Sequence, residues 1–279
     1  MSQMLTTKKD GTSIYYKDWG NGPTVVFSHG WPLSSDAFED QMLFLAQHGY
    51  RVIAFDRRGH GRSSQPWAGH SIDQYAEDLY QLVEHLNLDS FALVGHSTGG
   101  AVVTRYTAKY GQQKVTKLAL IAAVTPLMIK RDDYPDGVDP EVFDEMRANL
   151  LDNRADFYLD FAKKFYGYDK LLNKKSEGVV QNFWRIAMQG SIKAHYDCIE
   201  AFSETDLRED LKQLTVPTLV LYGTADEIVP PEICSQQAVK LLKHGVEEQI
   251  KGAPHGLCTT HKNEVSFALK QFFAEDSLL

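Results

Sequence analysis

The surroundings of Ser97 indicate a reactive residue, because Ser97 lies at the centre of Gly95-His96-Ser97-Thr98-Gly99. The apolar run FALVGH precedes the serine, and the helix-like segment GAVVTRYTAKYG follows it. A turn this tight between a strand and a helix leaves no room for side chains at positions 95 and 99, so both must be glycine. The start of the helix also directs its partial positive charge at the serine. A serine that only capped a helix would not require paired glycines, so we predict that Ser97 is a nucleophile.

A serine hydroxyl becomes a strong nucleophile only beside a base, which an acid orients in turn. With this kind of turn, the three groups follow in the order serine, acid, histidine, at the carboxyl ends of strands. Asp226 ends the run PTLVLYGTAD, and His255 ends EEQIKGAPH in a loop between a proline and a glycine. Glu227 is the alternative acid, but Asp226 lies directly at the strand turn. We therefore expect Ser97, Asp226 and His255 to form a catalytic triad.

Three further polar residues near these motifs are expected to have structural roles. Asp56 ends the run RVIAFD, and we expect it to fix its own glycine-rich turn, DRRGHGRSS, rather than to serve as the triad acid. His96 is expected to point to the opposite side of the Ser97 turn and to pack there. His29 is expected to form hydrogen bonds with loop backbone.

An acyl-transfer site also needs two backbone N–H groups that stabilise the oxyanion of the tetrahedral intermediate. We expect one from Thr98, the residue after the nucleophile, and the other from Trp31, in the loop SHGWPLSSD after the first parallel strand. Each such donor typically contributes roughly 3–4 kcal/mol of transition-state stabilisation.

The elements that position these residues alternate along the first half of the chain. Short apolar runs are typical of strands buried on both faces. They occupy residues 24–30, 51–56, 91–97 and 117–123. Helical segments follow the first two runs, with Ser35 or Asp36 as the expected N-cap of the first helix. This alternation predicts right-handed crossovers and a parallel sheet, and the segments MLTTKK and SIYYKDWG predict an antiparallel hairpin at its edge.

The middle of the chain has a different pattern. Residues 126–214 carry aromatic and charged residues at helical spacing, and PTLVLYGTAD then resumes the strand pattern. Long insertions in a sheet domain usually form lids or binding elements. We predict a core domain made of residues 1–125 and 215–279, and a helical cap over residues 126–214.

Composition excludes several classes of function. The chain has 279 residues and a formal net charge of −8, and its 29 Lys and Arg are scattered, so we expect no nucleic-acid partner. Its longest apolar run, LALIAAV at 118–124, is far too short for a membrane-spanning helix. Three cysteines without CxxC spacing favour reduced thiols in the cytoplasm, and argue against a disulfide framework and a zinc site.

The motifs HGWP, DRRGHGRS, GHSTGG, GTADEIVP and GAPHG occur in this order over nearly the whole chain. Together they resemble the α/β-hydrolase superfamily, and within it the cofactor-free bacterial haloperoxidases, also called non-heme chloroperoxidases or perhydrolases, and the related aryl esterases. The resemblance implies an eight-stranded, mostly parallel sheet with helices on both faces, and the roles given above to the triad, Trp31 and Thr98. Haloalkane dehalogenases and epoxide hydrolases share the fold but use an aspartate nucleophile, which Ser97 argues against.

The resemblance also implies an activity. Ser97 would attack an ester or a short carboxylic acid, after which water would release the acid, or hydrogen peroxide would release a peracid that oxidises bromide or chloride in solution. This chemistry needs no cofactor and no metal, and relatives commonly form homo-oligomers. The same triad would also suit a lactonase, a γ-lactamase-like amidase or a C–C hydrolase. A binding protein on a hydrolase scaffold is the alternative from another class.

For the substrate pocket, the resemblance points to residues from both parts of the chain. They are Trp31, Val124, Met128, Phe161, Phe165, Phe202 and Ile228. Pro32 is implied to favour perhydrolysis, because relatives that perform it tend to carry proline after the oxyanion-hole tryptophan; a proline that only fixes the loop is the alternative. From spacing alone, the stripe of Phe157, Phe161 and Phe165 is also consistent with core packing. Met128 and Met146 replace phenylalanines that are common in relatives.

Overall fold

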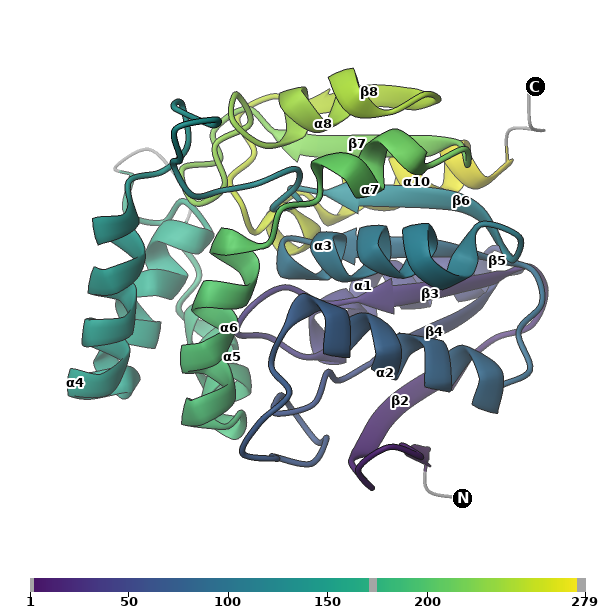
Figure 1. The fold of residues 1–279 in the computed structure, drawn as a ribbon, viewed down its shortest axis with the longest axis horizontal. Coiled ribbons are helices and arrows are strands. Elements are labelled where there is room, and N and C mark those ends of the chain that lie inside the picture. The colour runs from purple at the N-terminus through teal and green to yellow at the C-terminus, as the bar shows by residue number, and fades with distance from the viewer. Residues whose placement is uncertain (1–2, 171–174, 275–279) are drawn as a thin grey trace.

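A central sheet runs through the molecule (Figure 1). The structure is a computed structural model and describes residues 3–170 and 175–274. The strands are β1 (Met4–Thr6), β2 (Ser13–Trp19), β3 (Thr24–Ser28), β4 (Arg51–Phe55), β5 (Phe91–His96), β6 (Val115–Ile121), β7 (Thr218–Gly223) and β8 (Gly245–Ile250). Their spatial order is β1-β2-β4-β3-β5-β6-β7-β8, with antiparallel pairs β1–β2 and β2–β4 and parallel pairs elsewhere. This confirms the predicted eight-stranded, mostly parallel sheet and its edge hairpin.

Helices cover both faces of the sheet, which explains why its central strands are apolar throughout. Those of the core are α1 (Glu39–Gln47), α2 (Ile72–His85), α3 (Thr98–Tyr106), α8 (Ser235–Leu241), α9 (Leu257–Thr260) and α10 (Lys262–Ala274). In β3, Val25 packs in a buried cluster with α1 and α10, whereas its neighbour Val26 packs in a cluster with α2 and α3 on the other face. Consecutive side chains of a strand alternate between faces, so a strand covered on both faces needs apolar residues at every position.

The start of the first helix differs from the prediction. A 3₁₀ turn, η1 (Ser35–Phe38), precedes α1, and Ser34 caps it rather than Ser35 or Asp36. The Ser34 hydroxyl accepts a hydrogen bond from the backbone N–H of Asp36 at 3.3 Å. The prediction was wrong by one residue because the capping residue precedes this additional turn.

Between β6 and β7 the described chain leaves the sheet, forms two isolated β-bridges and then continues as helices. They are α4 (Pro140–Phe165), α5 (Glu177–Gln189), α6 (Ile192–Glu204) and α7 (Arg208–Gln213). α4 consists of two helices joined at a kink, where Asn153 has non-helical backbone angles. The first three stand beside the ends of the strands, and α7 packs against α3 and α8 (Figure 1). The predicted bounds of core and cap, which include residues outside the described ranges, stay a prediction.

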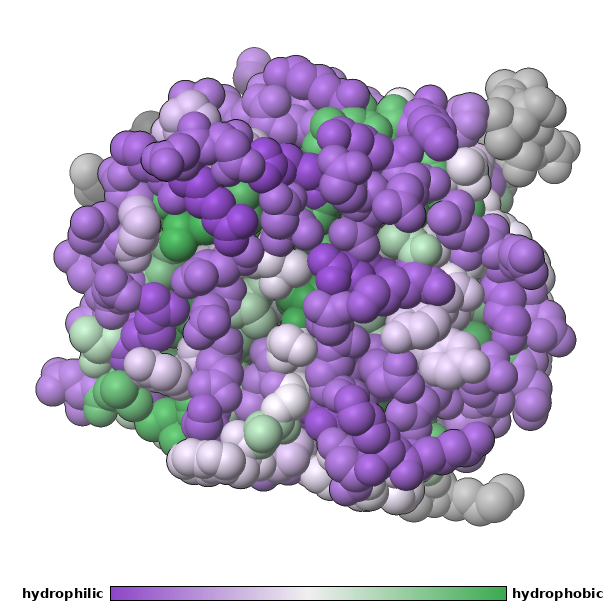
Figure 2. Space-filling view, in the orientation of Figure 1, coloured by the Kyte–Doolittle hydropathy of each residue, from purple (hydrophilic) through white to green (hydrophobic). Residues whose placement is uncertain are grey.

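On the face shown in Figure 2, hydrophilic residues dominate and hydrophobic side chains occur in small separate areas. Within residues 3–170 and 175–274, no helix combines the length and the apolar character needed to cross a bilayer.

The turn between β5 and α3 holds Ser97 at φ 55° and ψ −122°, in a region that residues other than glycine rarely occupy. Two glycines make this turn sterically feasible. A Cβ on Gly99 would lie 1.9 Å from the backbone oxygen of Ser28 at the end of β3, and one on Gly95 would lie 2.4 Å from the oxygen of Gly99. Because both obstacles are backbone atoms, the predicted need for glycine at these positions is confirmed.

His96 and His195 are buried in the core as neutral rings. Burial, and after it the charge of the neighbouring His255 ring, lowers the pKa of His96 to about 3. Burial, and after it the charge of Arg154, lowers the pKa of His195 to about 3. A histidine in an unfolded chain has a pKa of about 6.5, so the folded and unfolded states differ in their affinity for protons.

We expect the free energy of unfolding to fall as the pH decreases below about 6.5. Between that pH and about 3, the unfolded chain takes up protons that the folded His96 and His195 do not bind. At higher pH the rings are neutral in both states, and this effect disappears. Each histidine accounts for up to about 1.4 kcal/mol per pH unit. Urea unfolding followed by circular dichroism on both sides of the unfolded-state pKa measures the trend, and a constant free energy would contradict it.

Gly99→Ala is expected to prevent stable folding or to lower the melting temperature strongly, because the new methyl group would overlap the Ser28 carbonyl. Gly178→Ala is the matched control, since Gly178 is an exposed residue of α5 where a Cβ meets nothing within 4 Å. Helix propensity favours alanine there by up to about 1 kcal/mol, so this variant should melt at the same temperature or higher. Thermal unfolding of the two variants measures the contrast, and equal melting temperatures would refute the steric argument.

Candidate active site

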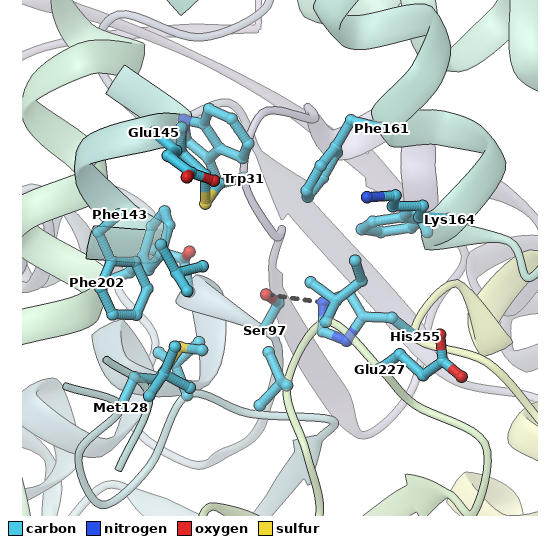
Figure 3. A pocket seen from close by; sticks show the side chains of 18 of the residues that line it. Trp31, Ser97, Met128, Phe143, Glu145, Phe161, Lys164, Phe202, Glu227 and His255 are labelled. Atoms are coloured by element: carbon cyan, nitrogen blue, oxygen red, sulfur yellow. Dashed lines mark hydrogen bonds between the residues drawn. The ribbon is translucent and has the colours of Figure 1, made fainter. Parts of the chain in front are cut away.

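Ser97, His255 and Asp226 form a hydrogen-bonded chain. His255 Nε2 lies 3.0 Å from Ser97 Oγ (Figure 3), and His255 Nδ1 lies 2.7 Å from Asp226 Oδ2. The other carboxylate oxygen, Asp226 Oδ1, accepts hydrogen bonds from the backbone N–H groups of Ile228 and Val229, both at 2.9 Å. With its proton on Nδ1, the imidazole donates to the carboxylate and accepts from the serine hydroxyl. Such a chain can move the serine proton to the ring while the carboxylate stabilises the resulting cation.

Parallel strands bring these three groups together. Ser97 directly follows β5, Asp226 lies in the turn after β7, and His255 lies in the loop after β8. The carboxyl ends of parallel strands meet at one edge of a sheet, so residues far apart in the sequence become neighbours there. The arrangement of the strands thus determines where the site lies. The segments that follow β5, β7 and β8 carry its polar side chains.

The loop that carries His255 is fixed from two sides. On the side of α4, the backbone N–H of Gly256 donates to the carbonyl of Phe165 at 2.7 Å, and the Phe165 ring meets the imidazole edge-on at 4.9 Å. On the side of the sheet, His96 Nε2 donates to the carbonyl of His255 at 3.0 Å. His96 is therefore packed, as expected, but it does not point away from the site. The loop after β8 passes over the end of β5, which brings the two histidines together.

Asp56 and His29 have structural surroundings, as predicted. Asp56 accepts hydrogen bonds from the backbone N–H groups of Ser35 and Arg62, at 2.8 and 2.7 Å. These bonds hold its own glycine-rich turn against η1. His29 Nε2 accepts a hydrogen bond from the backbone N–H of Arg57 at 3.0 Å, and Nδ1 donates to the next carbonyl at 2.8 Å.

Glu227 borders the same cavity as His255, but the carboxylate is bonded elsewhere. It is exposed, and its carboxylate forms an ion pair with Lys170 at 2.7 Å. Of the two candidate acids, Asp226 is the one hydrogen-bonded to His255.

Trp31 and Thr98 flank Ser97, and both border the cavity beside it. Thr98 is the first residue of α3, where backbone N–H groups have no partner within the helix. Trp31 lies after β3 in a turn closed by a hydrogen bond from the N–H of Leu33 to the carbonyl of Gly30 at 3.0 Å. These positions suit the two expected oxyanion donors, whose role stays a prediction.

The Trp31 side chain is held by the inserted helices, a contact that the sequence did not indicate. Its indole N–H donates to the backbone carbonyl of His195 in α6 at 3.1 Å. The His195 ring in turn bonds through Nδ1 to the hydroxyl of Tyr158 in α4 at 2.6 Å. The rings of Phe161 and Phe202 lie 5.4 and 5.8 Å from the indole. A bond to a backbone carbonyl leaves no residue pattern by which the sequence could reveal it.

A cavity of about 270 Å³ opens beside Ser97 and His255 (Figure 3). Seven of the expected pocket residues line it: Trp31, Val124, Met128, Phe161, Phe165, Phe202 and Ile228. Pro32 is not among the lining residues; it is buried in the turn after Trp31, to which a cis peptide bond joins it. Phe165 combines both interpretations of the aromatic stripe, since it packs against Phe183 and also borders the cavity. That these residues bind substrate stays a prediction.

Apart from Met146 and Phe157, which the sequence already connects with the pocket, the rest of the cavity wall was not predicted. Met146 and Phe157 border the cavity together with Val138, Val142, Phe143, Glu145, Asn149, Lys164, Glu227 and Val229. The kink in α4 allows residues from both of its halves to face the same space. Val142, Glu145, Met146 and Asn149 have the spacing of one helix face, but they mix apolar and polar side chains. This face of α4 therefore lacks the apolar stripe that usually signals burial.

Sequence matches extend over nearly the whole chain. A family model described as alpha/beta hydrolase fold matches residues 23–262. A non-heme haloperoxidase from Rhodococcus erythropolis is 49% identical over 96% of this chain and 98% of that protein. A bifunctional esterase/perhydrolase from Acinetobacter calcoaceticus is 48% identical over 95% and 98%. The crystal structure of a bromoperoxidase from Bacillus anthracis matches with a TM-score of 0.95 at 38% identity, over 99% and 100% of the two chains.

These matches include the turn that carries Ser97, the helical segment between β6 and β7, and the loop that carries His255. They agree with the strand order and with the strand–turn–helix geometry at Ser97. The chain therefore belongs to the α/β-hydrolase family.

Proposed function

We propose that this chain is a serine hydrolase that forms an acyl-enzyme from esters or short carboxylic acids and transfers the acyl group to water or to hydrogen peroxide. The observation that carries this proposal is the hydrogen-bonded chain from Asp226 through His255 to Ser97, at the wall of a mostly apolar cavity. Similarity to a haloperoxidase and to an esterase/perhydrolase over nearly the full length supports peroxide as the second acceptor.

In the first half-reaction, Ser97 Oγ attacks the carbonyl carbon of the substrate, and His255 Nε2 takes the serine proton. Asp226 keeps the ring oriented through Nδ1 and stabilises the imidazolium that forms. The backbone N–H groups of Trp31 and Thr98 stabilise the oxyanion, each by roughly 3–4 kcal/mol. The imidazolium then gives its proton to the leaving group, which is an alcohol from an ester or water from a carboxylic acid.

In the second half-reaction, His255 removes a proton from the acceptor, which attacks the acyl carbon, and then returns that proton to Ser97 Oγ. Water yields the carboxylic acid, and hydrogen peroxide yields the peracid. The peracid leaves the site and oxidises bromide or chloride in solution. Pro32 remains our candidate for tuning the choice of acceptor, and it would act through the Trp31 turn because it does not border the cavity.

The cavity indicates which substrates fit. Most of its lining side chains are aliphatic or aromatic, and its volume of about 270 Å³ suits a small apolar acyl group. We further propose a cytoplasmic location with reduced thiols, in line with the three free, buried cysteines. Self-association stays a prediction.

Ser97→Ala is expected to abolish hydrolysis of p-nitrophenyl acetate and peroxide-dependent halogenation of monochlorodimedone together, because both need the same acyl-enzyme. Loss of a triad nucleophile lowers kcat on the order of 10⁶-fold. Steady-state rates with each substrate measure the effect, and circular dichroism checks that the variant is folded. Halogenation that survives the substitution would show that the acyl-enzyme route is wrong. Failure of the wild type to react with a fluorophosphonate probe would favour a binding protein instead.

Asp226→Asn is expected to lower kcat by about 10⁴-fold, since the amide stabilises the wrong imidazole tautomer. Glu227→Gln is the matched control one residue away, and we expect it to lower kcat far less because Glu227 bonds to Lys170 rather than to the base. Comparison of kcat for ester hydrolysis distinguishes the two carboxylates. Similar losses in both variants would argue against Asp226 as the specific partner of His255.

A further inference from the structure

We propose that Met128 and Met146 are oxidised to sulfoxides by the peracid formed at Ser97, and that this modification limits the number of turnovers. The inference rests on the proposed function, because the oxidant is the product of perhydrolysis. Part of the peracid would then react with the protein inside the cavity, and the remainder would be released into solution.

Both methionines line the cavity that contains Ser97 and His255. Met128 is only 3% exposed, and it faces the space around Ser97 on the same side as Phe202 (Figure 3). Met146 is partly buried and approaches the cavity from the first half of α4. A peracid released in a space of about 270 Å³ contacts these walls before it reaches solvent. Its local concentration at the two sulfur atoms is therefore far higher than in the bulk.

The other described methionines lie elsewhere and provide internal references. Met42 is fully buried under the sheet, in the cluster formed with α1 and α10. Met188 is partly buried on α5, packed against the core cluster, and does not line the cavity. Met4 lies in the edge strand β1 and is partly exposed. Oxidation by a peracid from the bulk would depend on exposure, whereas oxidation from inside the cavity would favour the two lining residues.

The chemistry balances without another reactant. A thioether is a soft, polarizable nucleophile, and the three cysteines are not among the residues that line the cavity. A sulfur lone pair of Met128 or Met146 attacks the terminal oxygen of the peracid, and the O–O bond breaks. The hydrogen of that oxygen passes to the carboxylate oxygen, which leaves as a carboxylic acid. Sulfur is oxidised by two electrons to the sulfoxide, and the peracid is reduced by two.

A sulfoxide would change the binding properties of the pocket. It converts a flexible apolar side chain into a polar one, and the buried position of Met128 gives the new oxygen little access to water. Binding of an apolar acyl group beside it should weaken. Activity is therefore expected to decline with the number of peracid molecules formed, rather than with time in hydrogen peroxide alone.

The test compares wild type and Ser97→Ala, both incubated with acetate and hydrogen peroxide without halide. Peptide mass mapping then measures the fraction of each methionine that has gained one oxygen, and a parallel sample with bromide and monochlorodimedone reports peracid formation. We expect Met128 and Met146 to be oxidised at least several-fold more in wild type than in Ser97→Ala. They should also react ahead of Met4 and Met42. Peracetic acid added to Ser97→Ala should instead oxidise methionines in the order of their exposure.

The outcomes separate this inference from the proposed function. If peracid forms while Met128 and Met146 stay reduced, the inference is overturned and the proposed function stands. If wild type forms no peracid, the proposed function fails and the inference fails with it. Equal oxidation of the pair in wild type and Ser97→Ala would show that hydrogen peroxide, rather than the enzymatic product, is the oxidant.

A variant pair tests the effect on activity. Met128→Leu/Met146→Leu keeps the apolar volume and removes both sulfur atoms. Relative to its own starting rate, the double variant should lose esterase activity during perhydrolysis several-fold more slowly than wild type. Met188→Leu is the matched control and should lose activity as fast as wild type, because Met188 lies outside the cavity. Equal loss in the double variant and wild type would overturn the claim that oxidation of this pair limits turnover.

Discussion

The close approach of backbone segments around Ser97 is the constraint on which the rest of the site depends. Gly99 places the start of α3 against the carbonyl of Ser28 at the end of β3. Gly30 has a similar role, since a Cβ there would lie 3.1 Å from the Ser97 Cβ and 2.8 Å from His96 Nδ1. The contacts of Gly99 and Gly30 thus hold the Ser97 turn and the loop after β3 together, while Gly95 allows the Ser97 turn itself to close. Ser97 and the loop that carries Trp31 become neighbours because no side chain separates their backbones.

The positions of the catalytic groups depend on this packing and on the sheet. Parallel strands deliver Asp226 and His255 to the edge where Ser97 already lies. The inserted helices complete the surroundings of His255. The Phe165 carbonyl accepts a hydrogen bond from the N–H of Gly256, and the Phe165 ring packs against the imidazole. A helix that lies far from Ser97, Asp226 and His255 in sequence therefore restricts the His255 ring. Phe165 thus borders the cavity and also packs against the imidazole.

Much of the core could be predicted because its physical requirements are local. Strands covered on both faces must be apolar at every position, and the tight turn at Ser97 must have glycines, so both leave clear patterns in the sequence. The acid and the base could be named from their places after later strands. The number of strands and the pocket residues came from the resemblance to a family rather than from the residues themselves.

The unpredicted features are contacts between segments that carry no pattern of their own. The first half of α4 faces the cavity with Val142, Glu145, Met146 and Asn149, a mixture that has no apolar periodicity. His96 contacts the His255 loop because the loop after β8 reaches the end of β5, which no single segment reveals. The Ser34 cap was missed by one residue because a 3₁₀ turn and an α-helix begin with the same residue types. In the first two cases the missing information lay in tertiary geometry, and in the third it lay in the local backbone conformation.

The hydrogen bond between the Trp31 indole and the His195 carbonyl has a consequence for protein engineering. Exchanging the inserted helices between relatives would replace a large part of the cavity wall. Here a foreign cap must also present a carbonyl to the indole, or it leaves a buried donor unsatisfied at a cost of about 1–3 kcal/mol. A chimera that exchanges these helices must therefore conserve the carbonyl that accepts this hydrogen bond.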